Sequence, residues 1–356
     1  MTIPNFDSFR GDLRLKYSKG KKYYYIKIDL PFLKKDVYLG PGTLSEKELY
    51  ENYKVKLLTE TLYYFFKSEK ENKYSKYVND DAFITLELLR LSYHNLLKNY
   101  NKTDLQKYEE NIYTNYVYGT TSIEGNTYTL RETDITLNDN LTVSGKSSRE
   151  FYEIQNYSKL KEYLGNSTPK ISIELIKTIH KIILSNIDDN AAGSFRKVDV
   201  GIRGTKFTPT PPPLIEQEME DLIEWLRSNE STIYPVELVA IFHQKFEEIH
   251  PFIDGNGRVG RELVRILLKK YDFPSLFIGP SNRELYLSCL DKGNDDEGKS
   301  LTEFFISNLI SSQKKLISEC KIEIEKSIEI IEFEDSKFEK EIVKFQKKLN
   351  KIKFKN

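Results

Sequence analysis

Residues 250 to 261 contain more side chains suited to catalysis and phosphate binding than any other stretch of the 356-residue chain. They read His-Pro-Phe-Ile-Asp-Gly-Asn-Gly-Arg-Val-Gly-Arg. His250 is suited to accept a proton near neutral pH, because the unperturbed histidine pKa lies in that range. Asp254 offers a hard oxygen ligand for Mg²⁺, which proteins hold with one or two carboxylates together with substrate phosphates. The segment therefore predicts a general base beside a metal-binding acid.

A glycine-rich turn follows these two residues and precedes a helix with apolar periodicity. Gly255-Asn256-Gly257 lets the backbone turn tightly, so its N–H groups can face a phosphate at the helix N-terminus, where an anion is favoured. Arg258, Arg261 and Arg265 are spaced by three and four residues, so we expect them to share one helix face and address successive phosphates. The pattern predicts a polyphosphate cradle with a base beside it.

This segment resembles the signature of the Fic family, histidine-any-phenylalanine-any-acid-Gly-Asn-Gly-Arg-any-any-Arg. Every specified position is matched, by His250, Phe252, Asp254, Gly255, Asn256, Gly257, Arg258 and Arg261. The resemblance implies a protein adenylyltransferase, which moves AMP from ATP to a Ser, Thr or Tyr hydroxyl of a target protein. The Doc-like kinases of this family carry Ala-Asn-Lys where this chain has Gly-Asn-Gly, which disfavours transfer of a phosphate.

The resemblance also implies a role for each signature residue. His250 would deprotonate the target hydroxyl, and Asp254 would hold Mg²⁺ on the α and β phosphates of ATP. The turn from Gly255 to Arg258 would bind the phosphates, with Arg258 near the β phosphate and Arg261 near the γ phosphate.

A second motif lies upstream, Thr120-Thr121-Ser122-Ile123-Glu124-Gly125-Asn126. It resembles the inhibitory motif of the family, Ser/Thr-any-any-any-Glu-Gly/Asn, which implies that Glu124 pairs with Arg261 and blocks the γ phosphate. A carboxylate desolvated beside a guanidinium competes with a phosphate oxygen for the same donors. The residues alone predict that Glu124 ends a helix and Gly125 caps it in the left-handed conformation.

Two other functions remain open alongside AMP transfer. In some relatives the inhibitory glutamate activates a water that removes AMP from modified targets, so Glu124 would serve a deAMPylase. The third reading is a binding or scaffold protein that acts through its terminal units.

Two further regions are assigned through the resemblance. Alternating Val198, Val200 and Ile202 ahead of a proline-rich stretch predict a β-hairpin over 192–213. It resembles the family's flap, whose edge pairs with a target protein, through Ser194, Phe195, Arg196, Lys197, Val198, Asp199 and Val200. Tyr286 and Asn294 resemble the region that closes over the nucleotide base, Tyr286 lining the adenine pocket and Asn294 hydrogen-bonding the base.

We expect a mainly α chain to position these residues. It would form a Fic-type helical bundle with a β-hairpin flap, together with a small N-terminal β-containing unit and a charged C-terminal helix. We expect a β/α unit over 1–78, a helical region over 79–165, the catalytic core over 166–312 and the charged helix over 313–356. An apolar seam from Phe338 to Ile352 fits either a self-packed helix or a coiled-coil homo-oligomer.

Composition bounds the partners. Lys+Arg 54 equals Asp+Glu 54, so nothing in the net charge indicates nucleic acid or an anionic membrane. The aromatic and basic residues of the N-terminal strands are therefore interpreted as a hydrated sheet surface. No apolar stretch predicts a membrane span or a leader, and we expect a cytoplasmic protein. Two separated cysteines and a His243/Glu247 pair without a third ligand do not predict a structural metal site. The expected partners are ATP, Mg²⁺ and a target protein, and a second copy of this chain counts among the candidate targets.

Overall fold

The computed structural model describes residues 11–30, 33–45, 48–49, 52, 60, 75–99, 101–165, 167–201 and 207–314. The chain divides into two compact units, residues 1–71 with 315–356, and residues 72–314. The helical region expected at 79–165 and the core expected at 166–312 thus lie in one unit. The C-terminal segment from 315 onward, with its apolar seam and Cys320, lies outside the described residues.

The first unit contains the antiparallel sheet predicted from its alternating pattern. Strands β1 (Gly11–Ser18), β2 (Lys21–Leu30) and β3 (Leu33–Pro41) lie in the order β1-β2-β3. Lys19 and Gly20, at φ 49° and 73°, form the tight turn between β1 and β2, as type I′ hairpins require. One face of the sheet is buried, through Tyr24, Ile26, Val37 and Leu39.

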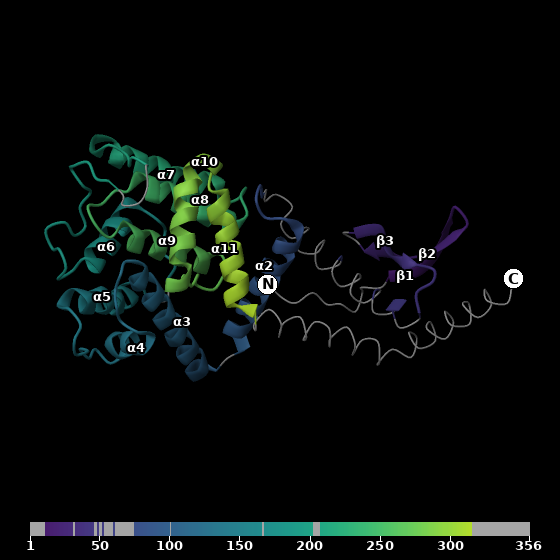
Figure 1. Ribbon diagram of the computed structural model, residues 1–356, viewed down its shortest axis with the longest axis horizontal. Coiled ribbons are helices and arrows are strands. Elements are labelled where there is room, and N and C mark those ends of the chain that lie inside the picture. Colours follow the sequence, from purple (N-terminus) through teal and green to yellow (C-terminus); the bar gives the residue numbers. More distant parts are fainter. Residues whose placement is uncertain are drawn as a thin grey trace. The chain divides into compact units, whose positions relative to one another are not determined.

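The second unit is helical and holds both motifs (Figure 1). Its α-helices are α2 (Asp80–Asn99), α3 (Lys102–Ile123), α4 (Leu130–Asn138), α5 (Ser148–Leu164), α6 (Ile173–Ile183), α7 (Ile215–Asn229), α8 (Pro235–Ile249), α9 (Asn256–Lys270), α10 (Arg283–Asp296) and α11 (Lys299–Ser312). Short 3₁₀ turns precede α7 (Pro212–Leu214) and α10 (Pro280–Asn282). Helices α2 to α5 fall within the helical region expected over 79–165.

Helices α8 and α9 form the centre of this unit. Buried side chains lie on nearly every side of both helices, including Val239, Phe246, Val259, Leu263 and Leu267. A helix that is buried all round belongs to a protein core, where close packing fixes its position. The signature loop joins these two helices, so its residues rest on the best-packed part of the unit.

The predicted β-hairpin at 192–213 is wrong for the residues that the structure describes. Residues 192–201 and 207–211 contain no strand, while 202–206 lie outside the described part. Prolines at 209 and 211 remove backbone donors that a ladder needs. The buried Arg196 joins the two arms instead, because its guanidinium donates to the carbonyl oxygens of Val198 and Thr210.

Within the described ranges, every helix is too short or too polar to span a bilayer.

Candidate active site

The signature loop begins with a strained histidine and ends at a helix N-terminus. His250 caps α8 in the left-handed region, at φ 50° and ψ 59°, and Gly255 precedes α9 at φ 82°. The Asn256 side chain closes the loop, because it accepts from Phe252 N and donates to Phe252 O, both at 2.8 Å. The first N–H groups of α9 have no partner within the helix, and such a helix end favours an anion; binding of a phosphate here stays a prediction.

The pairing of Glu124 with Arg261 that the inhibitory motif predicts is present at this helix end. Arg261 Nη2 lies 2.6 Å from Glu124 Oε1, and Arg261 Nε donates to Thr120 Oγ1 at 2.7 Å. Thr120 stands one helical turn before Glu124, so the first and last positions of the motif share one face of α3. Glu124 follows the last residue of α3 and Gly125 is left-handed at φ 98°, as expected.

Electrostatics keeps this pair ionised. Burial raises the pKa of Glu124, but the attraction of Arg261 and its hydrogen bond outweigh burial and leave the pKa below its ordinary value. Burial also opposes the charge of Arg261, yet Glu124 raises the pKa of the guanidinium well above its usual range. A charged carboxylate therefore pairs with Arg261 beside the start of α9.

Gly257 makes room for this arrangement. A Cβ at that position would lie 2.7 Å from Glu124 Oε1 and 2.8 Å from Arg261 Nη1. The Glu124 carboxylate thus lies against the first turn of α9, where the helix dipole favours negative charge.

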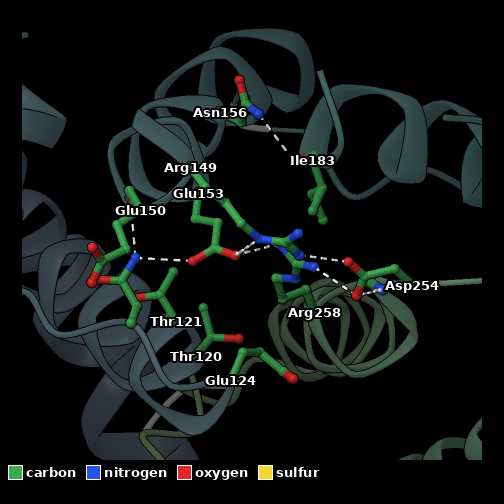
Figure 2. Close-up of polar contacts among 12 residues, drawn as sticks. Thr120, Thr121, Glu124, Arg149, Glu150, Glu153, Asn156, Ile183, Asp254 and Arg258 are labelled. Carbon is green, nitrogen blue, oxygen red and sulfur yellow. Dashed lines mark hydrogen bonds and ion pairs between the residues drawn. The ribbon is translucent and has the colours of Figure 1, made fainter. Parts of the chain in front are cut away.

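Arg258 and Asp254 belong to a buried network that the sequence analysis missed. Figure 2 shows the Arg258 guanidinium between two carboxylates: Nη2 lies 3.0 Å from Asp254 Oδ1, and Nη1 lies 3.4 Å from Glu153 Oε1. Arg149, one turn before Glu153 on α5, reaches Asp254 Oδ2 at 2.6 Å. Burial raises the pKa of Asp254, but the charges of Arg258 and Arg149 lower it by more, so the net shift is downward. Asp254 is therefore ionised at neutral pH.

No motif pointed to Glu153 or Arg149. They form an i, i+4 pair on an amphipathic helix, a pattern typical of many solvated surfaces. Glu153 also accepts a hydrogen bond of 3.0 Å from Asn126, which ties the end of the inhibitory motif to the same network.

His250 is neutral in this environment. Burial is the main cause that lowers the pKa of its imidazole to about 4, and the charge of Arg196 acts in the same direction. The Glu247 carbonyl, Glu124 and Asp254 act against this shift without reversing it. A neutral imidazole at pH 7 has a nitrogen free to accept a proton.

The His243/Glu247 pair forms a second polar cluster beside His250. Glu247 Oε2 is 3.9 Å from His250 Nδ1, and Glu247 Oε1 is 4.0 Å from His243 Nδ1. Burial raises the pKa of Glu247 to about 8, with Arg261 opposing and Glu124 reinforcing the shift. A Cβ on Gly260 would lie 2.5 Å from Glu247 Oε1, so this cluster depends on that glycine.

The same cluster reaches Arg261 from behind. His243 Nε2 lies 2.7 Å from the Tyr286 hydroxyl, and the Tyr286 ring centroid lies 5.9 Å from the Arg261 guanidinium carbon. Tyr286 is only 1% exposed, and its place in an adenine pocket stays a prediction. The side chain of Asn294 is outside the described part.

Arg265 does not address phosphate as expected. Its Nη2 lies 2.6 Å from the fully buried Glu262, and its guanidinium packs over the rings of Tyr113 and Tyr116. This buried ion pair, further along α9, holds the Arg265 guanidinium away from the loop. The sequence did not predict a metal site at His243 and Glu247. Among the described residues, no group of three or more His, Cys, Asp or Glu side chains is placed to hold a metal ion.

Phe252, the phenylalanine of the signature, and His180 pack together and support the signature loop. Phe252 is fully buried, and its ring stacks on His180 with centroids 3.7 Å apart. Gly193 N donates to His180 Nδ1 at 2.9 Å, so Nε2 carries the proton and donates to Asp254 O at 3.0 Å. His180 thereby positions the backbone of Asp254.

The expected docking residues of the flap separate into two groups. Arg196 is buried and donates to His250 O at 2.8 Å, while Phe195 packs on Phe252 with centroids 5.4 Å apart. Ser194, Lys197, Val198 and Asp199 are exposed and Val200 is part-exposed. The first group fixes the loop, and the second group is available to a partner.

Comparison with known proteins agrees with this geometry. The model of the Fic/DOC family matches residues 170–268. The chain is 33% identical over 221 residues to Protein adenylyltransferase fic-1 of Caenorhabditis elegans, an alignment that covers 59% of this chain and 43% of that protein. It is 32% identical over 204 residues to Protein adenylyltransferase Fic of Drosophila yakuba, covering 56% and 41%. The chain thus spans under half the length of these curated relatives.

Solved structures show the same fold. Fic-1 from C. elegans matches with a TM-score of 0.57 and 26% identity, covering 78% of each chain. A Fic domain containing signalling protein from Bacteroides thetaiotaomicron matches with a TM-score of 0.59 and 22% identity, covering 67% of this chain and 97% of that chain. The fold and the signature together define a Fic domain. Residues 170–268 are the part of the chain that matches the Fic/DOC family.

Proposed function

We propose that this protein transfers AMP from ATP to a hydroxyl of a target protein, and that Glu124 restrains the reaction. The observation that carries the proposal is the contact of 2.6 Å between Glu124 Oε1 and Arg261 at the N-terminus of α9. A carboxylate stands where an anion is electrostatically favoured, beside a neutral His250. The names of the curated relatives support AMP transfer as the reaction.

The residues suit each part of this reaction. His250 takes the proton of the target hydroxyl, whose oxygen bonds to the α-phosphorus of ATP as the bond to the β-phosphate oxygen breaks. Pyrophosphate leaves, and the α9 N–H groups with Arg258 and Arg261 stabilise its charge. The target then carries AMP through a phosphodiester.

The donor set around Asp254 suits Mg²⁺. Asp254 is ionised, its side chain is 42% exposed, and magnesium takes one or two carboxylates together with phosphate oxygens. Asp254 would hold the ion, which would neutralise charge on the phosphates. Arg149, whose side chain is 57% exposed, pairs with this carboxylate at 2.6 Å.

A cavity beside the flap supports a protein as the acceptor. Its volume is about 580 Å³, and its lining includes Thr208, Pro211, Trp225, Lys245 and Ile249. Ile249 precedes the proposed base, so a segment bound in this cavity would lie next to His250. We propose that the target docks along this cavity and the exposed residues Lys197 to Asp199.

The test is incorporation of radioactivity from α-labelled ATP with Mg²⁺ into the protein itself or into added extract. We expect weak labelling by the wild type and strong labelling by Glu124→Gly, because the competing carboxylate is gone. Glu124→Gly combined with His250→Ala is the matched control and should lose the signal. Absence of labelling by a folded Glu124→Gly variant, with γ-labelled ATP also inactive, would overturn the proposal.

Removal of AMP is the second candidate, because Glu124 is ionised and its side chain is 36% exposed. An ionised carboxylate in the site is able to activate water. Wild-type protein would then release AMP from a target labelled by Glu124→Gly, and Glu124→Gly itself would not. A protein that neither adds nor removes AMP would favour a role as a binding protein instead.

A further inference from the structure

Positive charge is concentrated in the N-terminal sheet, although the whole chain is neutral. Residues 11–45 contain eight Lys and Arg against three Asp and no Glu, an excess of five positive charges. Seven of the basic side chains in this segment are exposed, namely Arg14, Lys16, Lys19, Lys21, Lys22, Lys34 and Lys35. The segment 11–45 is therefore basic, although the net charge of the whole chain is zero.

The register of the sheet gathers three tyrosines on one face. Tyr24 and Ile26 are buried on the inner face, and because side chains alternate along a strand, Tyr23 and Tyr25 lie on the outer face. Tyr38 pairs directly with Tyr25 across the ladder. Its ring centroid lies 5.5 Å from that of Tyr25 and 6.2 Å from that of Tyr23.

This aromatic cluster is open to solvent. Tyr38 is 46% exposed, and Tyr23 and Tyr25 are part-exposed. The packing needs of the sheet are met on its other face, where Tyr24, Ile26, Val37 and Leu39 are buried. Adjacent exposed rings on a well-formed sheet indicate a binding surface, since contiguous apolar patches on a surface usually mark one.

Cations border the rings on the neighbouring strand. Arg14 stands opposite Tyr25 and Lys16 opposite Tyr23 in the ladder. The Lys16 ammonium lies 4.6 Å from the Tyr25 ring centroid and 2.6 Å from Asp36. Lysine thus remains beside the rings, held by a carboxylate and by the ring face.

We propose that this outer face, formed by Arg14, Lys16, Tyr23, Tyr25 and Tyr38, binds single-stranded nucleic acid. Unpaired bases supply flat rings that stack on tyrosine, and the phosphates complement the surrounding cations. A duplex keeps its bases stacked inside, and an acidic peptide offers charge without rings. Neither uses the tyrosines and the cations together.

The experiment is fluorescence anisotropy of the full-length protein with labelled 20-nucleotide dT and U strands, at several salt concentrations. We expect binding that weakens with salt, and a loss of about ten-fold or more in affinity for Tyr25→Ala with Tyr38→Ala, since stacking supplies much of such binding. Arg14→Ala should lower the slope of log affinity against log salt by about 0.7, the value for one phosphate contact on a single strand.

Matched controls separate this surface from a general effect. Tyr163→Ala removes a tyrosine that is 53% exposed in the other unit and should leave binding unchanged. Circular dichroism must show that the tyrosine double variant retains its sheet; if it unfolds, Tyr38→Phe, which keeps the stacking ring, and Tyr38→Ser provide the comparison. Equal binding by wild type and folded tyrosine variants, tighter binding to a duplex, or equal binding to polyglutamate would each overturn the proposal.

Discussion

Glu124 and Arg261 form an ion pair in which Glu124 Oε1 lies 2.6 Å from Arg261 Nη2. The two residues are separated by 136 intervening positions yet meet at the first turn of α9. Because Thr120 also binds Arg261, through both its hydroxyl and its carbonyl, the guanidinium stays oriented when Glu124 leaves. The inhibitory motif therefore supplies both the competitor and the support of the arginine.

Glu124→Gln should tighten binding of ATP by about ten-fold to a hundred-fold. Hydrogen bonds to charged groups contribute about 1.5–3 kcal/mol, and the neutral amide competes less well for Arg261. Isothermal titration calorimetry with ATP and Mg²⁺ measures the change. Glu162→Gln, an exposed residue of α5, is the control and should bind as the wild type does. Unchanged affinity in Glu124→Gln would mean that the ion pair does not restrain ATP.

Glu153→Ala should lower the free energy of unfolding by about 3–5 kcal/mol, the usual cost of leaving one partner of a buried ion pair alone. Arg258 is 2% exposed and would keep only Asp254 as a partner. Urea unfolding measures the loss, with Glu162→Ala on the same helix as the control. A loss equal to that of the control would show that Arg258 is satisfied by other groups.

Glu247→Gln should change how stability depends on pH. Its folded pKa is raised to about 8 from an ordinary 4.5, with burial as the main cause. The folded state therefore holds a proton that the unfolded state releases between these values, and stability is lost as pH rises from about 4.5 through 8. Glutamine has no such proton, so the variant should gain stability relative to wild type over that range.

Thermal unfolding of both proteins at pH 5, 6, 7 and 8 measures this difference. His243, His250, Arg261 and Glu124 face Glu247 and remain in both proteins, so their titration affects both alike. A constant difference in melting temperature across the range would contradict a raised pKa at Glu247.

The sequence predicts the part of the site that is local, and it misses the part that depends on packing. His250 to Arg261 form one continuous loop and helix start, so spacing alone places them together. Glu153 and Arg149 reach Asp254 only because α5 packs near α9's N-terminus, and no local pattern encodes that contact. The prediction that Arg265 faces a phosphate was wrong for the same reason, because the buried Glu262 beside it decides where its guanidinium points. The hairpin failed because Arg196 replaces a backbone ladder with side-chain hydrogen bonds.

Gly257→Ala should weaken ATP binding in both wild type and Glu124→Gly. The added methyl would lie 2.7 Å from Glu124 Oε1 and 2.8 Å from Arg261 Nη1, closer than real side chains approach, so the ion pair must separate. In the Glu124→Gly background one clash is removed, but the clash with Arg261 remains and displaces the arginine that would meet the phosphate. Gly201→Ala is the control, because nothing lies within 4 Å of a Cβ built there. Measured by calorimetry with ATP, a defect confined to the wild-type background would mean that the methyl acts only through Glu124 and that Arg261 adjusts freely.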